Sequence, residues 1–523
     1  MKRRTLLKAA AASALLPAPA IGQGNAKVLL CAPEANLASI DPVWTTATVA
    51  VNYGYMVYDT LYGSDVGLVP RPQMAEGHTL SDDKLLYTFK LRAGLAFHDG
   101  EPVRSRDCIA SINRWSKRSA WGQALGARIE EMKVVDDRSF TMRLKMPFAL
   151  TLNALGQGHS FIMPERVALT DPFKQITETV GSGPFMFKRD EWIAGAKAVW
   201  VKNTKYVPRD EEPNMLSGGK RVFVDRVEQI VMPDGATAAA ALQSGEIDWV
   251  QVPTIDLIPM LKKSRGVRTF VNDPFGWVGV IRPNFLHPPF NNPKLLRAIL
   301  PAVDQKEFLA AVIGDQQELG KEPVGIFALG TPMANTAGLE VLSGPRDLAL
   351  AKRLVAESGY KGEKVVLMSP TDQPALTQIS QVTRELFMKL GLNVEYQSMD
   401  WSTLVSRRAS REPPDKGGWN AFCTAWDGMS VSDPGGHFPI RGNGRGAWFG
   451  WPDDPKMEAL RDAWFNAPDL AAQKKLAEEI QIHAMQEVPI IPTGQWFTPN
   501  ATRDNIHDIV RSALALHWNV KKG

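Results

Sequence analysis

The sequence is poor in cysteine, in long apolar runs and in excess charge of either sign. Its three cysteines, Cys31, Cys108 and Cys423, are too few for a disulfide framework or a four-cysteine zinc site. No later segment has the roughly 20 apolar residues of a membrane span, so we expect a chain that does not span a membrane. The formal net charge of +4 matches the four basic residues within residues 1–26, a stretch without any acid. The remainder is near neutral, which argues against a nucleic-acid-binding protein.

The sequence also lacks the common signatures of enzymes. It has no G-x-S-x-G nucleophile elbow, no phosphate-binding GxxxxGK[ST] loop, and no close metal-ligand pair among its eight histidines. Gly181-Ser182-Gly183 is followed by Pro184, a pattern that favours a turn. Scattered cysteines are typical of buried structural thiols. We therefore expect no catalytic residues, no resident metal and no cofactor.

Residues 1–26 read as an export signal. A basic start precedes the apolar stretch 9–16 and then small residues, which is the pattern of a cleaved secretory signal. The run Arg3-Arg4-Thr5-Leu6-Leu7-Lys8 resembles the twin-arginine export motif. We expect cleavage near residues 20–26 and a periplasmic product.

The rest of the chain predicts a mixed α/β protein. With 44% apolar and 22% charged residues, its composition is that of a globular protein, and 523 residues allow about three domains. The pattern predicts strands at 365–368 and 393–396 on either side of a helix over 375–390, and such a β-α-β unit implies parallel pairing. Further helices are predicted over 234–244, 346–357 and 470–486, and another beginning at Pro293.

Tryptophan is abundant in this sequence, and its clustering points to a binding site. Of 15 tryptophans, Trp419, Trp426, Trp448 and Trp451 fall within 33 residues, among glycines and the polar residues Asp427, Asp433, His437 and Arg441. Flat apolar walls with a few polar anchors suit a small-molecule site, whereas a structural aromatic core is the alternative. The following run 441–446, RGNGRG, fits either an anion-binding nest or a solvated loop.

Six stretches in succession resemble one family, the extracellular solute-binding proteins of family 5, which are the peptide and nickel receptors of ABC transporters. One stretch alone would be weak evidence, whereas six in the family's order are a strong signal. The stretches are Leu37–Pro42, Leu85–Gly100, Val180–Phe185, Gln243–Asp248, the block from Pro288 to Asp304, and Ala351–Tyr360.

The resemblance implies a periplasmic-binding-protein-like fold of type II, the large dipeptide- and oligopeptide-binding type, with two α/β lobes and an inserted extra domain. We place the first lobe at 27–70, 182–272 and 490–523, the inserted domain at 71–181, and the second lobe at 273–489. Closure of the lobes around a ligand would signal occupancy to the permease.

The resemblance also implies where a ligand binds. Peptide-binding members carry a W-x-x-D-x-x-D-P segment whose first aspartate pairs with the peptide's amino group. Aligned on Asp433-Pro434, this chain has Ser430 at that position, and Asp427 replaces it only with a local insertion. Glu34 and Asn36 fall in a loop that lines the cleft in the family. The complete set of expected ligand-binding residues is Glu34, Asn36, Trp401, Trp419, Trp426, Asp427, Ser430, His437 and Arg441.

The leading hypothesis is a monomeric receptor that delivers a peptide or similar small polar solute to ABC transporter permease subunits. The second hypothesis keeps this role but gives it an opine, a sugar conjugate or a metal chelate, because Ser430 carries no charge for an ammonium group. An exported hydrolase or redox enzyme is a third hypothesis, and a periplasmic chaperone or structural protein is a fourth.

Overall fold

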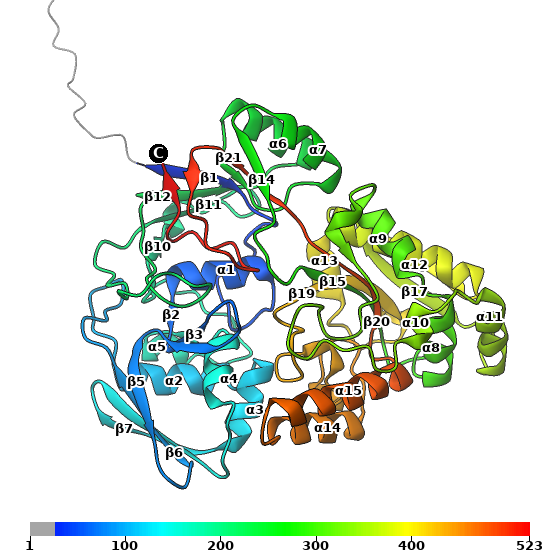
Figure 1. Ribbon diagram of the computed structural model, residues 1–523, viewed down its shortest axis with the longest axis horizontal. Coiled ribbons are helices and arrows are strands. Elements are labelled where there is room, and N and C mark those ends of the chain that lie inside the picture. Colours follow the sequence, from blue (N-terminus) through cyan, green and yellow to red (C-terminus); the bar gives the residue numbers. More distant parts are fainter. Residues whose placement is uncertain (1–26) are drawn as a thin grey trace, which may run out of the picture.

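The computed structural model describes residues 27–523, which form two lobes and an inserted domain (Figure 1). The predicted export signal, residues 1–26, lies outside the described residues. Each of the three parts is built around its own sheet. Within residues 27–523, no helix combines the length and the apolar character needed to cross a bilayer.

The first lobe contains a seven-stranded mixed sheet. Central β1 pairs in parallel with β12 and β13, and the other pairings are antiparallel. Helix α1 lies between this sheet and the inserted domain (Figure 1), and α6 ends at Gly245, whose φ of +80° suits glycine. The strands in sheet order are β10 (Phe185–Phe187), β11 (Lys197–Lys202), β12 (Arg226–Ile230), β1 (Val28–Ala32), β13 (Trp249–Val250), β21 (Asn500–Arg503) and β14 (Val267–Phe270), and the helices are α1 (Thr48–Val57), α6 (Gly235–Ser244) and α7 (Ile258–Lys263).

The inserted domain is an antiparallel four-stranded sheet with helices on one side (Figure 1). Its strands alternate buried and exposed residues, as in Leu86–Leu91, so one face packs on the helices. The strands are β5 (Ala75–Leu80), β6 (Leu86–Leu91), β8 (Ser139–Leu144) and β7 (Ile129–Asp136), and the helices are α2 (Ser105–Trp115), α3 (Ala120–Arg128), α4 (Thr151–Gln157) and α5 (Glu165–Ala168). Short pairs β2 (Asp59–Thr60) with β9 (Phe161–Ile162) and β3 (Tyr62–Ser64) with β4 (Pro70–Pro72) join it to the first lobe.

The second lobe contains a six-stranded sheet flanked by most of the chain's longer helices (Figure 1). The predicted β-α-β unit is confirmed, because β17 and β18 pair in parallel. The strands in order are β16 (Gly320–Lys321), β20 (Ile491–Trp496), β15 (Trp277–Pro283), β19 (Ala421–Asp427), β17 (Lys364–Pro370) and β18 (Asn393–Met399). The helices are α8 (Pro293–Ile299), α9 (Gln305–Ile313), α10 (Glu340–Ser343), α11 (Leu348–Glu357), α12 (Pro374–Lys389), α13 (Trp401–Arg407), α14 (Pro455–Phe465) and α15 (Leu470–Glu487).

The chain returns to the first lobe later than the sequence indicates. Strand β20 pairs with β15 and β16 and so belongs to the second sheet, although we expected residues from 490 onward in the first lobe. The reason is that Ile491–Trp496 is buried along its whole length, a pattern that fits either sheet equally well. Two connectors, residues 271–276 and 497–499, therefore join the two lobes.

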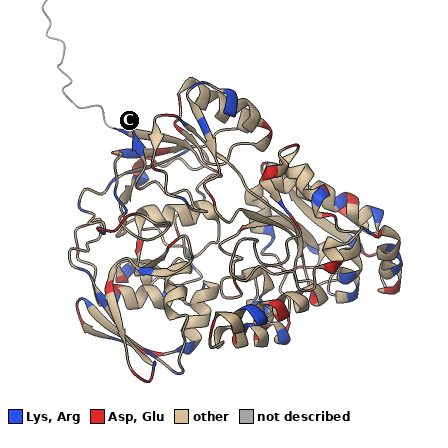
Figure 2. Cartoon of the chain, viewed as in Figure 1, with Lys and Arg blue, Asp and Glu red and all other residues tan. Residues whose placement is uncertain are grey.

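Charged residues are found along the outer elements of all three parts (Figure 2). Basic and acidic residues are interspersed over the outer helices, and in this view neither sign dominates a face (Figure 2). The three cysteines are free and buried, as predicted.

Candidate functional site

A cavity of about 450 Å³ lies between the lobes. This volume is within the usual range for a small-molecule site. The loop before α1 and the start of α1 form the first-lobe wall, and the ends of β15, β19 and β20 with α13 form the opposite wall. Its lining residues include Glu34, Asn36, Ser39, Trp44–Ala50, Gln175 and Val252 on one side and Trp277, Gln373, Trp401–Ser402, Val405–Ser406, Arg408, Thr424–Asp427, Trp448, Trp496 and Thr498 on the other.

Tryptophan forms much of this wall. Strand register explains part of the cluster, because Trp277 on β15 lies opposite Asp427 on β19 and opposite Trp496 on β20. The rings of Trp426 and Trp448 meet edge to face, with centroids 5.0 Å apart. Flat aromatic walls of this kind contribute affinity through the apolar contact area that they bury, and polar groups set the orientation of the ligand. The lining tryptophans are Trp44, Trp277, Trp401, Trp426, Trp448 and Trp496.

Arg408 is the basic side chain of the second-lobe wall, and it lacks an acidic partner. It follows α13, is 7% exposed, and its guanidinium lies 4.7 Å from the ring centroid of Phe449 and 5.5 Å from that of Trp448. Within residues 27–523 its side chain makes no ion pair or hydrogen bond, and its buried Nε has no partner. Burial lowers the pKa of Arg408 to about 10. An unpaired guanidinium facing a cavity suits a carboxylate.

Three carboxyl groups gather near the connectors. Burial, with repulsion from Asp427, raises the pKa of Glu34 to about 7. Burial also raises the pKa of Asp273, in the first connector, to about 7, and Oδ2 of this residue has no partner. Asp427 has a pKa raised by burial, and its Oδ1 accepts a hydrogen bond from the Ser430 N–H at 2.9 Å. Among residues 27–523 none of the three forms an ion pair, so the cluster suits a cation such as an ammonium group.

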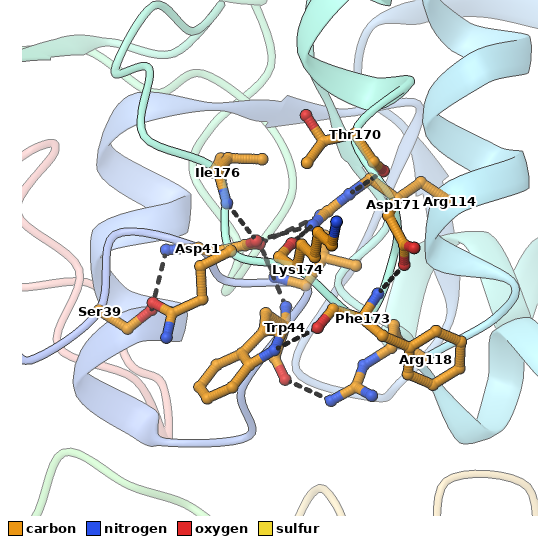
Figure 3. Close-up of polar contacts among 12 residues, drawn as sticks. Ser39, Asp41, Trp44, Arg114, Arg118, Thr170, Asp171, Phe173, Lys174 and Ile176 are labelled. Carbon is orange, nitrogen blue, oxygen red and sulfur yellow. Dashed lines mark hydrogen bonds and ion pairs between the residues drawn. The ribbon is translucent and has the colours of Figure 1, made fainter.

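The inserted domain holds the loop that carries Trp44 (Figure 3). Asp41 is fully buried and pairs with Arg114 of α2 through two bonds, Oδ2 to Nη2 at 2.7 Å and Oδ1 to Nη1 at 3.1 Å. The same carboxylate accepts the N–H groups of Trp44 at 3.1 Å and Ile176 at 3.0 Å. Arg118 donates to the Trp44 carbonyl at 2.6 Å. One carboxylate therefore fixes the shape of the first-lobe wall.

Arg282 organises the opposite wall in a similar way. Its side chain is fully buried on β15 and donates to backbone carbonyls of Phe449 at 2.6 Å, Pro439 at 2.6 Å and Trp448 at 3.1 Å. With a fourth bond to Pro489 at 2.8 Å, the guanidinium joins two loops. Among residues 27–523 it has no carboxylate partner, and carbonyl oxygens satisfy its guanidinium instead. Arg282 thereby supports the Trp448 side of the cavity.

Five of the expected ligand residues line the main cavity. They are Glu34, Asn36, Trp401, Trp426 and Asp427. The Asn36 side chain also accepts a hydrogen bond from the Gly195 N–H at 2.9 Å. Ser430 lines a smaller neighbouring cavity instead.

The other three expected residues lie elsewhere. Trp419 is fully buried and packs against Phe422, with centroids 5.0 Å apart, so it belongs to the core. His437 is fully buried and Nε2 lies 2.7 Å from the Ile326 carbonyl. Arg441 pairs with Glu458 at 3.0 Å. Closeness in sequence to Trp426 placed these three in the set, but Trp419 packs in the core before β19, and no residue from 430 to 447 lines the main cavity.

Sequence reasoning missed Arg408, Asp273 and the tryptophans at 44, 277 and 496. Arg408 stands in the polar run RRASRE, which reads as a solvated helix end. Its burial comes from Trp448 and Phe449, 40 residues further along the chain. Asp273 belongs to the Pro- and Gly-containing break at 272–276, a break that marks a connector but gives no sign of its burial.

The protein has two α/β lobes joined by two connectors, and charged side chains line the cavity between the lobes. This arrangement is that of a solute-binding protein. The chain belongs to the bacterial extracellular solute-binding proteins of family 5, whose middle-region model matches residues 69–448. The resemblance in the sequence is thereby confirmed.

One known relative is similar over the whole length of the chain. The chain is 37% identical to a probable peptide ABC transporter periplasmic-binding protein, y4tO, of Sinorhizobium fredii, over 100% of this chain and 99% of the relative. Among solved structures, the agropinic acid complex of AgaA from A. tumefaciens R10 has a TM-score of 0.80 at 19% identity and covers 95% of this chain and 99% of its own. A Pseudoalteromonas sp. SM9913 dipeptide-binding protein with Met-Leu has a TM-score of 0.80 at 18% identity, over 95% and 100%. These structural similarities confirm the expected fold.

Proposed function

We propose that this chain is the periplasmic receptor of an ABC importer and that it captures a short peptide between its lobes for delivery to the permease. The observation that carries the proposal is a cavity with an unpaired guanidinium, Arg408, and a separate group of unpaired carboxyls at Glu34 and Asp427. A free peptide has one carboxylate and one ammonium group, which match these two kinds of anchor. The whole-length similarity to a probable peptide-binding protein supports the same ligand class.

The roles of individual residues follow from their chemistry. Arg408 holds the ligand carboxylate, Glu34 and Asp427 hold the amino group, and the tryptophan walls contact the peptide between them. The other expected ligand residues have different places: Trp401 and Trp426 belong to the walls, and Asn36 stabilises the first-lobe loop. Trp419, His437 and Arg441 support the structure around the cleft.

The second candidate is a non-peptide solute such as an opine, a sugar conjugate or a metal chelate. The observation that favours it is neutral Ser430 at the position where the family resemblance expects an aspartate. Against a multiply acidic opine stands the excess of carboxyls: Glu34 and Asp427 line the main cavity with a single described guanidinium, that of Arg408, and Asp273 lines an adjoining small cavity together with Glu34. We therefore favour the peptide.

The cysteine thiols of this chain fit a binding role better than a catalytic one. Burial raises the pKa of the three thiols, that of Cys423 to about 11, so these cysteines are poor nucleophiles at neutral pH. We propose further that the chain is exported through residues 1–26, acts as a monomer, and is divided into lobes at the connectors 271–276 and 497–499, with an inserted domain over about 71–181.

Isothermal titration calorimetry with short peptides tests this function. We expect a two- or three-residue peptide with free termini to bind, and an N-acetylated or C-amidated version to bind at least tenfold more weakly, since each loses one charge pair. Equal binding of free and blocked peptides would overturn the assigned anchors. Binding of opines or sugar conjugates with no binding of any peptide would move the answer to the second candidate.

A further inference from the structure

The inserted domain touches the second lobe outside the main cavity. In Figure 1, α3 of the inserted domain lies beside α14 of the second lobe. Buried apolar residues on the two sides belong to one continuous cluster, whereas most buried apolar residues of the first lobe form two others. We call the contact of Trp121, Arg128 and Phe148 with α14 and with the loop 433–436 the outer contact.

Aromatic rings from both sides form the centre of the outer contact. The ring centroid of Trp121 on α3 lies 5.8 Å from that of Phe465 and 6.2 Å from that of Trp464, both on α14. The ring of Phe148, which precedes α4, lies 5.7 Å from that of Phe465. Each of the four residues is at most 4% exposed. Separating the two sides would bring these rings into water, which is unfavourable in proportion to their apolar area.

Arg128, at the end of α3, adds a charge to these rings. Its guanidinium lies 4.8 Å from the ring centroid of Phe148 and 5.2 Å from that of Phe465, so one ring from each side contacts it. Nη2 of Arg128 donates to Oδ1 of Asp462 on α14 at 3.0 Å. The Arg128 side chain is 8% exposed and that of Asp462 is 71% exposed. The cation–π contacts and the ion pair therefore both hold Arg128 against the second lobe.

A loop of the second lobe fits closely over Trp121. A Cβ on Gly435 would lie 2.4 Å from the indole ring, so a larger residue there would push the two parts away from each other. Asp433 shapes this loop, because its Oδ1 accepts the N–H groups of Gly435 at 2.8 Å and of Gly436 at 3.1 Å. The backbone of the second lobe is thus formed to accept a side chain of the inserted domain.

The outer contact is non-covalent, and it has to break when the lobes separate. The inserted domain is tied to the first lobe by the buried pair of Asp41 and Arg114 and by the pairing of β2 with β9, so it moves with that lobe. The chain reaches the second lobe through the connectors 271–276 and 497–499. A rotation about these connectors that widens the cavity therefore draws α14 away from α3.

We propose that the outer contact is a latch, which favours the closed arrangement of the lobes before a ligand binds and so raises the affinity for every ligand by the same factor. The apparent dissociation constant is the intrinsic constant divided by the fraction of molecules in the binding-competent arrangement. The main cavity is not lined by the latch residues Arg128, Phe148, Asp462, Trp464 and Phe465, so the latch does not select between ligands. The inference goes beyond the proposed function, because it holds whichever solute the cavity takes.

Small-angle X-ray scattering tests the latch without any ligand. We expect ligand-free Phe465→Ala to have a larger radius of gyration than ligand-free wild type, because the variant lacks the ring that contacts Trp121, Phe148 and Arg128. Phe223→Ala, at a side chain that is 42% exposed, is the matched control and should scatter like wild type. A lower melting temperature of Phe465→Ala with unchanged scattering would mean a merely structural role and would overturn the inference.

A milder variant tests the latch in case Phe465→Ala does not fold. Asp462→Lys changes an exposed side chain and places a like charge beside Arg128. By calorimetry, its affinity for Ala-Ala-Ala and for Gly-Gly-Gly should fall by one common factor of about three or more. Because salt screens exposed charges, a high salt concentration should reduce this loss. Glu479→Lys, exposed on α15, makes the same change of charge and should bind like wild type.

The two tripeptides separate the latch from the proposed function. Unequal losses of affinity in Asp462→Lys, or no loss, would overturn the inference and leave the proposed function intact. If wild type bound neither tripeptide, the proposed peptide function would be refuted. The ligand-free scattering of Phe465→Ala and Asp462→Lys would then decide the latch alone, since it needs no ligand.

Discussion

At the scale of single residues, the cleft differs from the rest of the protein in how its charges are paired. Elsewhere, buried charged side chains have partners of either kind: carboxyl-amine or carboxyl-guanidinium pairs, as Arg114 has with Asp41 and Lys220 with Asp59, each at 2.7 Å, or carbonyl oxygens, as Arg282 has. Arg408 is buried to a similar degree without one. A buried charge left unpaired costs stability, so Arg408 is costly to the ligand-free fold and useful to a ligand that brings a carboxylate.

The first prediction follows from this imbalance. Arg408→Gln should weaken the binding of a peptide with a free carboxylate at least tenfold and leave the melting temperature of the ligand-free protein unchanged or higher, because the variant removes a charge that burial disfavours. Calorimetry and thermal unfolding measure the two effects. Arg353→Gln, at an exposed site on α11, is the control and should change neither. Normal affinity in Arg408→Gln would contradict the role of Arg408.

The second prediction concerns pH. Since the pKa values of Glu34 and Asp273 are about 7, both carboxyls become neutral as the pH falls below 7, and the ammonium group of a peptide then loses Glu34 as a charged partner. Peptide affinity should therefore decrease from pH 8 to pH 5. The stability of the ligand-free protein should change in the opposite sense, because these carboxyls hold protons in the folded state between about pH 4.5 and 7 and release them on unfolding.

Glu34→Gln separates this effect from other titrations. The variant should bind more weakly at pH 8 and show a flatter affinity profile between pH 5 and 8, whereas Glu130→Gln, on an exposed site of β7, should keep the wild-type profile. Calorimetry at four pH values measures these profiles. Identical slopes for wild type and Glu34→Gln would rule out Glu34 as the group responsible.

At the scale of elements, hydrophobic periodicity predicted the strands and helices that the local sequence determines. It did not predict which residues of distant segments meet at the cavity. The unit β17-α12-β18 was predicted correctly because its strands and helix carry their own hydrophobic patterns. Among the residues expected at the site, Glu34, Trp426 and Asp427 line the cavity. Trp419 and His437 do not, because tertiary packing, which a one-dimensional pattern does not contain, decides which face of a loop points inward. Arg408 was missed for the same reason.

The third prediction concerns the loop that carries Trp44. Asp41→Asn leaves Arg114 without its charge partner, and breaking a buried ion pair costs about 3–5 kcal/mol of unfolding free energy. Because this carboxylate also orients the backbone of the first-lobe wall, peptide affinity should fall as well. Urea unfolding and calorimetry measure the two losses. Asp82→Asn, in an exposed turn, should stay within about 0.5 kcal/mol of wild type. A destabilised Asp41→Asn that binds with full affinity would show that the loop does not shape the cavity.

At the scale of the whole molecule, the main cavity lies where two lobes are joined by two connectors. The connector 271–276 runs beside the end of β20 and the start of the second connector, 497–499. The Gln495 side chain donates to the Phe275 carbonyl at 2.6 Å, and a Cβ on Gly276 would lie 3.1 Å from the Phe497 ring. Gly276 has a φ of +65°, and a Cβ there would lie 2.6 Å from the Trp496 carbonyl, so only glycine fits. The connectors thus form a narrow joint, and the walls of the cavity come from opposite sides of it. Contacts that a ligand makes with both walls bias the protein toward the closed arrangement.

The last prediction is that a bound peptide makes the protein more compact. A compact chain of about 500 residues has a radius of gyration of about 23 Å. We expect the ligand-free protein to sample open arrangements and so to exceed the value of its own saturated complex. Small-angle X-ray scattering measures both. Arg408→Gln should stay at the ligand-free value at a peptide concentration that saturates wild type, because the ligand then lacks its anchor on the second lobe, whereas Arg353→Gln should contract normally. A peptide blocked at both ends should leave the wild-type curve unchanged, which separates closure from a non-specific effect of added solute. Superimposable curves for free and saturated wild type would mean that the lobes are already fixed before binding. In that case the preference for one ligand would come from the preformed cavity alone, and the permease would need a signal other than closure.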